Sequence, residues 1–256
     1  MIDPSYAACG LGVGFLVGLT GVGGGSLMTP LLILLFGVHP VSAVGTDLLF
    51  AACTKSVGAV IHAQARTIDW RVAGRLALGS LPAVAAVILA LSLLGSRPDA
   101  IAKAITPMLG VALLLTAVLL LFQNRVRLAV ASGTPLPSGR ARGLTVAAGA
   151  GLGALVSLSS VGAGALGVTV LSILYPRLPP ARVVGTDIAH AIPLTLLAGT
   201  GYWMMGAVDA QLLGSLLSGS VPGILLGSLL ATRVPTRVLR GALAATLAMA
   251  AVRMLA

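Results

Sequence analysis

The chain has 256 residues, of which 57% are hydrophobic and 9% are charged, and its mean hydropathy is +1.07. Soluble domains carry about a quarter charged residues, so this composition excludes an ordinary soluble protein and predicts an all-α integral membrane protein. The net charge of +10 comes from 16 Lys and Arg against 6 Asp and Glu. Most arginines lie between apolar runs without interleaved aromatic residues, so we expect no nucleic-acid partner.

In chain order, each half of the sequence contains one segment interrupted by glycines, followed by three apolar helices that approach the length of a membrane span. In the first half these are expected at 6–36, 42–63, 72–94 and 101–122. In the second half they are expected at 145–175, 183–205, 211–231 and 238–255. A linker rich in Ser, Gly, Pro and Arg, 123–143, separates transmembrane repeats at 1–122 and 144–256.

The two halves are related by an internal repeat. At an offset of 140 residues, Val44-Gly45-Thr46-Asp47 aligns with Val184-Gly185-Thr186-Asp187, and Gly79-Ser80-x-Pro82 aligns with Gly219-Ser220-x-Pro222. Upstream of Pro40 the offset is 139, which places the glycine-rich residues 20–25 over 159–164. Several matches in one register are not expected by chance, so we interpret the halves as homologous.

Charge predicts that the halves have opposite orientations. Cytoplasmic loops are enriched in Lys and Arg, and the arginine-rich connections here are 64–71, the linker 123–143, 176–182 and 232–240. The connections at 95–100 and 206–210 then face outward, so corresponding loops lie on opposite sides of the membrane. This pattern indicates an inverted repeat. It also requires each glycine-interrupted segment to return to its starting side, as a re-entrant hairpin of two short helices.

The two glycine-rich breaks are candidate substrate sites. A break within the membrane exposes the first N–H groups of the following helix, and these groups together with the helix dipole attract anions. The alternative is that the small residues only allow close helix packing. The candidate residues are Thr20, Gly23, Gly24, Gly25 and Ser26 in the first break, and Ser159, Ser160, Gly162 and Gly164 in the second.

The Thr-Asp pairs of the repeated motif allow two interpretations. Thr46, Asp47, Thr186 and Asp187 lie near the starts of apolar helices, where such side chains commonly cap free N–H groups. They are also placed to line the pathway, with the threonines contacting substrate and the aspartates binding a proton or cation that drives transport. Both interpretations can hold together.

Two further ionisable residues lie inside predicted helices. Lys55 is within 42–63, where a charge costs a few kcal/mol (about 2.5–3.5) unless it faces a cavity or a partner. Its counterpart is Thr195, so only one half supplies this positive charge. His190 follows Asp187 by three residues and shares its helix face, as a proton relay would require, although a hydrogen-bonded structural histidine fits equally well.

Taken together, the first glycine turn, the paired Val-Gly-Thr-Asp motifs and the Gly-Ser-x-Pro echo resemble the TauE/SafE family of sulfite and organosulfonate exporters. The resemblance covers nearly the whole chain. It implies export of a small sulfur-containing anion across the bacterial inner membrane, with the breaks and the Thr-led motifs as substrate-site candidates. The second break, Val161-Gly162-Ala163-Gly164, departs from the family pattern because it lacks a triple glycine.

We therefore expect an alternating-access exporter in the inner membrane, with a small anion and the lipid bilayer as partners and protons as the coupling ion at Asp47, Asp187 or His190. A channel-like pore and a transporter of another small organic anion are the alternatives. No enzyme, cofactor or metal site is expected, because the helices contain no HExxH motif and the cysteines, Cys9 and Cys53, lie in apolar stretches. A homodimer is left open.

Overall fold

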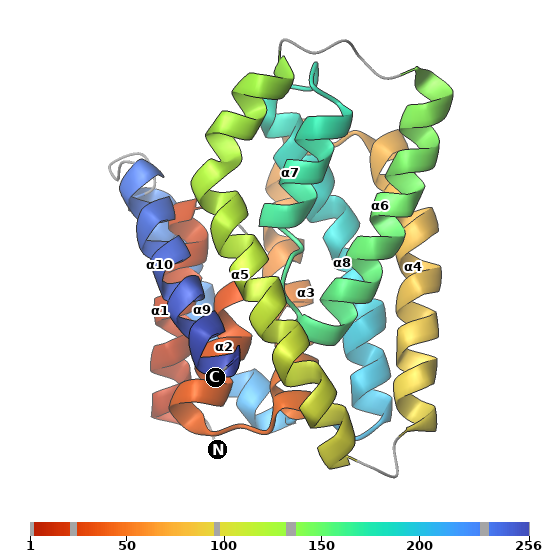
Figure 1. Ribbon diagram of the computed structural model, residues 1–256. Coiled ribbons are helices and arrows are strands. Elements are labelled where there is room, and N and C mark those ends of the chain that lie inside the picture. The colour runs from red at the N-terminus through yellow and green to blue at the C-terminus, as the bar shows by residue number, and fades with distance from the viewer. Residues whose placement is uncertain (1–2, 21–24, 95–97, 132–136, 231–235, 256) are drawn as a thin grey trace.

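The computed structural model describes residues 3–20, 25–94, 98–131, 137–230 and 236–255, and within these ranges it contains helices and no strand (Figure 1). Among the described residues, six helices are long and apolar enough to cross a membrane, namely α3, α4, α5, α6, α8 and α9. The described helices are α1 (Pro4–Thr20), α2 (Gly25–Phe36), α3 (Pro40–Gln64), α4 (Trp70–Leu93), α5 (Pro98–Ala131), α6 (Ser138–Ser159), α7 (Ala165–Leu174), α8 (Pro180–Met204), α9 (Ala210–Leu230) and α10 (Thr236–Leu255).

The helices follow the expected order, but two of them are longer than expected. α5 continues beyond 122 to Ala131, and α6 begins at Ser138 rather than near 145, so much of the segment 123–143 is helical. The residues after 122 include no Gly or Pro before 133, so nothing in their backbone chemistry ends the helix there. α6 therefore has 22 residues and is not the short helix that the hairpin interpretation required.

The helices pack in pairs drawn from opposite halves of the chain. α3 lies beside α8 at the centre, α1 packs against α9, α6 packs against α4, and α5 packs against α10. In Figure 1, α6 descends from the upper end of the bundle and α7 returns toward that end. The first short pair, α1 and α2, lies toward the lower end, where the chain starts. The pairs α1–α2 and α6–α7 thus start from opposite ends of the bundle.

Glycines allow two of these helix pairs to approach closely. A Cβ atom at Gly14 of α1 would overlap the backbone of Ser220 on α9, and a Cβ atom at Gly153 of α6 would overlap the backbone of Ser80 on α4. Close backbone contact of this kind is how small residues hold helices together in membranes, where lipid removes the hydrophobic driving force. These contacts hold α4 against α6 and α9 against α1. α4 and α9 in turn pack against α8 and α3, which carry the ionisable residues.

The starts of α4 and α9 are held by the opposite half of the chain. The side chain of Asp69 caps α4 by accepting from the amides of Arg71 and Val72, while its own amide donates to the Thr186 hydroxyl at 2.9 Å. The amide of Asp209, which precedes α9, donates in the same way to the Thr46 hydroxyl at 3.3 Å. The threonines therefore do not cap their own helices; each one supports the N-cap residue of a helix from the other half.

Candidate functional site

The second break lies in the buried interior of the bundle. α6 ends at Ser159, Ser160 adopts a left-handed conformation with φ of 56°, and α7 begins at Ala165. Gly162 and Gly164 have φ values of 113° and 134°, which a residue with a side chain rarely adopts. The glycines are therefore required for the chain to turn here, whatever they bind.

The two serines of this break differ in what their hydroxyl groups do. Ser159 donates to the carbonyl of Leu155 at 2.7 Å and is completely buried, so its hydroxyl is already used within the protein. The Ser160 hydroxyl is buried and has no hydrogen-bond partner, and it lies close to the carboxylate of Asp47. Of the two serines, Ser160 is therefore the one free to contact a ligand.

The first break lies largely outside the described residues. α1 ends at Thr20 and α2 begins at Gly25, and residues 21–24 lie outside the described residues. Gly23 and Gly24 fall between the two helices and outside the described residues, and the side chains of Thr20 and Ser26 are not described. The assignment of substrate contacts to Thr20, Gly23, Gly24, Gly25 and Ser26 stays a prediction.

Asp47 is hydrogen-bonded to the short helix α2 of the first half and lies close to Ser160 of the second break. It lies on α3 with its side chain completely buried, and its Oδ2 atom accepts from both the amide and the hydroxyl of Thr29 on α2. Its Oδ1 atom has no hydrogen-bond partner among the described residues. Sequence reasoning missed Thr29, although a hydroxyl within an apolar stretch was a usable signal; the aligned residue in the second half is Val168.

Asp187 is buried without any such donor. Its side chain on α8 is 1% exposed, and neither carboxylate oxygen has a hydrogen-bond partner among the described residues. The Oδ1 atom lies directly against the α carbon of Gly167 on α7, where any side chain would overlap it. Since Val168 cannot replace Thr29 as a donor, the two aligned aspartates have different chemical surroundings. A buried carboxylate without donors is costly and usually functional.

Lys55 supplies positive charge to this region from α3. Its side chain is 5% exposed, and its Nζ atom donates to the carbonyl of Ala163 in the second break at 2.7 Å. It interacts electrostatically with both aspartates, more strongly with Asp187 than with Asp47. The main counter-charge of Lys55 therefore comes from the other half of the chain and not from Asp47 on its own helix. Its aligned counterpart, Thr195, donates only to the carbonyls of Ala191 and Ile192 within α8 itself.

His190 lies near the same charge but is held by a different helix. It is 2% exposed, and its Nε2 atom is 2.8 Å from the hydroxyl of Ser80 on α4. It is within electrostatic range of Lys55. It makes no hydrogen bond to Asp187, although both lie on α8. Ser80 belongs to the repeated Gly-Ser-x-Pro motif and was not selected from the sequence; a polar residue repeated within an apolar helix was the signal.

The buried site thus comprises one lysine, two aspartates, a histidine and the polar turn of the second break. Thr46 and Thr186 lie outside this cluster, since they contact Asp209 and Asp69. No group of three or more His, Cys, Asp or Glu residues that could hold a metal occurs among the described residues. What the site offers is a cation, free carboxylate oxygens and a free hydroxyl, all out of reach of water, which is chemistry suited to binding an anion or a proton.

Comparison with known proteins decides the family. The sequence model for the family described as "Sulfite exporter TauE/SafE" matches residues 6–254. The chain belongs to the TauE/SafE family. It is similar to the "Probable membrane transporter protein YjnA" of Bacillus subtilis (strain 168), with 38% identity over 219 residues that cover 84% of this chain and 85% of the relative.

A second relative is similar to this chain over a shorter stretch. The "Probable membrane transporter protein YunE" of Bacillus subtilis (strain 168) is 41% identical over 68 residues, which cover 27% of this chain and 25% of the relative. No solved structure matches the chain significantly. Membership of the TauE/SafE family and the six apolar helices together indicate a multi-pass membrane transporter.

Proposed function

We propose that this chain exports a small sulfur-containing anion, such as sulfite or an organosulfonate, across the bacterial inner membrane. The observation that carries the proposal is the contact of Lys55 with the second break. An ammonium group buried in the membrane is a functional site by default, and here its hydrogen-bond acceptor is the Ala163 carbonyl of a broken helix. An oxyanion that enters the site would replace this carbonyl as the acceptor.

Backbone amides provide the second part of the anion site. The first N–H groups of α7, at Ala165 and Leu166, have no acceptor within their own helix. They begin where the break ends, so the positive end of the α7 dipole points into the region of Lys55 and Ser160. The substrate contacts in this proposal are Lys55, the Ser160 hydroxyl and the amides that follow Gly164, with the first break contributing from the other side.

The inverted repeat is the proposed basis of alternating access. The paired contacts of Thr46 with Asp209 and of Thr186 with Asp69 support it, because equivalent residues make the same bond in the two halves. The opposed helix pairs α1–α2 and α6–α7 and the arginine-rich loops support it as well. Rocking of one half against the other would open the buried site first to one side and then to the other.

Proton coupling is assigned to Asp187 in preference to Asp47. Asp47 is held by two donors from Thr29, whereas Asp187 has none. The charged group that acts on Asp187 is Lys55 on α3, and His190, on α8 itself, faces the same lysine. A carboxylate with free oxygens beside one shared cation can accept a proton when an anion takes over the lysine, so that substrate and proton move together.

The proposal is tested by anion binding to purified protein in detergent. Sulfite, sulfate, thiosulfate, taurine, sulfoacetate and acetate are each added, and the melting temperature is measured for the unchanged protein, Lys55→Gln and Lys103→Gln. The control is matched because Lys103 is exposed on α5 and the chain has no other lysine besides Lys55. We expect a sulfur oxyanion or sulfonate to raise the melting temperature of the unchanged protein and of Lys103→Gln, but not of Lys55→Gln.

A second measurement separates a transporter from the channel-like alternative. In reconstituted vesicles preloaded with unlabelled substrate, a transporter accumulates labelled substrate transiently by counterflow, whereas a pore does not. The absence of any anion-dependent change in melting temperature would contradict the anion site. Binding of carboxylates but not of sulfur oxyanions would redirect the proposal to another small organic anion.

A further inference from the structure

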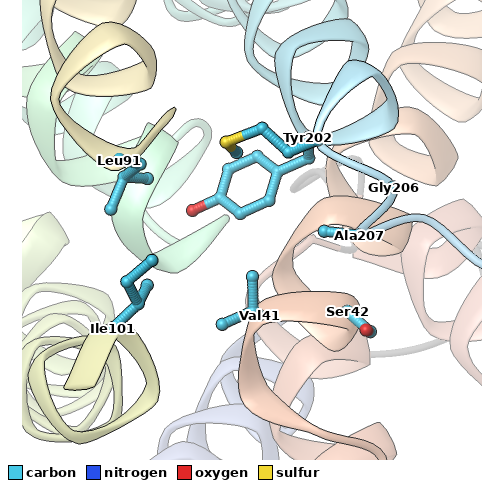
Figure 2. Close-up of a pocket in the computed structure, with 8 residues that line it drawn as sticks. Val41, Ser42, Leu91, Ile101, Tyr202, Gly206 and Ala207 are labelled. Carbon is cyan, nitrogen blue, oxygen red and sulfur yellow. The ribbon is translucent and has the colours of Figure 1, made fainter. Parts of the chain in front are cut away.

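A cavity of about 220 Å³ lies between the ends of four helices, away from the buried site (Figure 2). Its lining includes Val41 and Ser42 at the start of α3, Leu91 near the end of α4, Ile101 near the start of α5, and Tyr202 with Ala207 at and just beyond the end of α8. By the distribution of arginines, these helix ends face the outside. Figure 2 shows the Tyr202 ring above Val41, with its hydroxyl group directed toward the side of Leu91.

Tyr202 lines this cavity and also contacts α3 and α6. Its side chain is completely buried, and its hydroxyl donates to the carbonyl of Ser157 on α6 at 3.0 Å. Its Cβ atom lies so close to Gly45 that a Cβ atom there would be 2.8 Å away. Ser157 comes shortly before the second break, and Gly45 immediately precedes Thr46-Asp47. The Tyr202 side chain therefore contacts both the first part of α3 and the end of α6, the two helices that lead to the buried site.

The aligned residue in the first half occupies the corresponding place at the opposite end of the bundle. Tyr202 aligns with His62 at the offset of 140, and His62 lies against Gly185 as Tyr202 lies against Gly45. His62 is only partly buried, and its Nδ1 atom is 2.8 Å from the Thr67 hydroxyl. Each aromatic ring thus lies against the glycine that begins the Gly-Thr-Asp sequence of the other half.

We propose that Tyr202 is the outer gate of the transport path and that the cavity is its outer vestibule. This inference rests on the proposed transport function. In the conformation described here, the ring against Gly45 and the bond to Ser157 hold the path closed on the outside. Outward opening breaks the Tyr202–Ser157 hydrogen bond and moves the ring away from Gly45, so that an anion can pass between the vestibule and Lys55.

The gate is tested by the access of a reagent from outside. A reporter, Ser160→Cys, is placed in a background with Cys9→Ala and Cys53→Ala, and right-side-out vesicles are treated with the membrane-impermeant, anionic reagent methanethiosulfonate ethylsulfonate. We expect Tyr202→Ala to raise the rate of reporter labelling at least about tenfold, because the ring is removed. Tyr202→Phe keeps the ring and loses one hydrogen bond, so the expected increase is roughly two- to tenfold.

The control is Tyr175→Phe, which removes a hydroxyl bonded to Thr145 at 2.7 Å at the opposite end of the bundle. Its labelling rate from outside should equal that of the reporter alone. If the alanine variant is not recovered as a folded monodisperse protein, the phenylalanine variant decides the test. Equal labelling rates in the reporter protein and in both the Tyr202 and Tyr175 variants would overturn the gate.

The result is separable from that of the proposed function. If Tyr202 controls labelling but no anion binds or shows counterflow, the gate stands and the substrate assignment fails. If a sulfur-containing anion shows counterflow and the labelling rate of the reporter is the same with and without the Tyr202 substitutions, the transport function stands and the gate fails.

Discussion

The Lys55 ammonium group donates a 2.7 Å hydrogen bond to the carbonyl oxygen of Ala163, and this contact ties a central helix of the first half to the break of the second. A lysine enclosed among apolar helices needs a compensating partner, and here it has a carbonyl and the charge of Asp187. If one half moves against the other, these contacts of Lys55 must break and be replaced by others. The same group therefore couples ligand binding to the relative position of the halves.

The Lys55–Asp187 pairing predicts a non-additive effect on stability. Lys55→Met should lower the free energy of unfolding by about 3–5 kcal/mol, because it leaves a buried carboxylate without its cation. Adding Asp187→Asn removes that isolated charge, so the double variant should be more stable than Lys55→Met alone. The measurement is chemical denaturation in detergent, analysed as a double-mutant cycle.

The control for this cycle is Lys103→Met, at an exposed position on α5, which should change stability by no more than about 0.5 kcal/mol. Simple addition of the two single effects would show that the lysine and the aspartate do not depend on each other, and would contradict the pairing.

Replacement of Asp187 should remove the pH dependence of transport. In Asp187→Asn the carboxylate that has no donor among the described residues is replaced by an amide that cannot bind a transported proton. We expect counterflow without a proton gradient to persist, and the stimulation of export by a pH gradient to be lost. Initial rates in vesicles between about pH 5.5 and pH 8 measure this, since buried carboxylates can titrate within this range.

Asp209→Asn is the matched control for the pH profile. Asp209 is exposed and its side chain accepts from the amides of Gln211 and Leu212 at the start of α9, a role that asparagine fills equally well. An unchanged pH profile in Asp187→Asn, or an equal change in Asp209→Asn, would remove Asp187 as the coupling residue.

Much of the helical framework could be predicted from the sequence because its signals are local. Apolar runs located the helices, and the offset of 140 paired Thr46 with Thr186 before their contacts were known. The ends of α5 and α6 were missed because these helices continue into polar residues, where hydrophobicity no longer marks them. The residues there favour a helix by their local propensity, but they are not apolar, so hydrophobicity does not indicate the helix.

The site was only partly predictable because its contacts cross between the halves. Lys55, Asp47 and Asp187 were recognisable as charges in apolar helices, but the choice of Asp187 as the main counter-charge depends on how α3 packs against α8. Thr29 was missed because its hydrogen bonds to Asp47 span two helices. Tyr202 gave no signal in the sequence, since a single aromatic residue near a helix end is common in membrane proteins.

Loss of the Thr29 hydroxyl should destabilise the protein through Asp47. Thr29→Val keeps the side-chain shape but removes the hydroxyl that donates to a buried carboxylate, which is expected to cost about 1.5–3 kcal/mol. Thr246→Val is the control, because the Thr246 hydroxyl is exposed and bonds only to carbonyls of its own helix. Thermal unfolding of both variants measures the difference. Equal melting temperatures for Thr29→Val and Thr246→Val would contradict a structural role for the Thr29–Asp47 bond.

The close contact of α1 with α9 predicts opposite outcomes for two glycines of the same helix. A side chain at Gly14 would overlap the backbone of Ser220, whereas a Cβ atom at Gly12 meets no atom within 4 Å. Gly14→Val should therefore push α1 away from α9 and lower stability by about 1–3 kcal/mol or more, as overpacking does. Gly12→Val introduces the same residue, with the same helix propensity, on the open face.

Thermal unfolding of the purified variants distinguishes the two positions. Because lipid supplies no hydrophobic force to restore a separated pair of helices, the loss of stability in Gly14→Val should be large. Equal stability of the two valine variants would mean that close approach of these helices does not hold the bundle together.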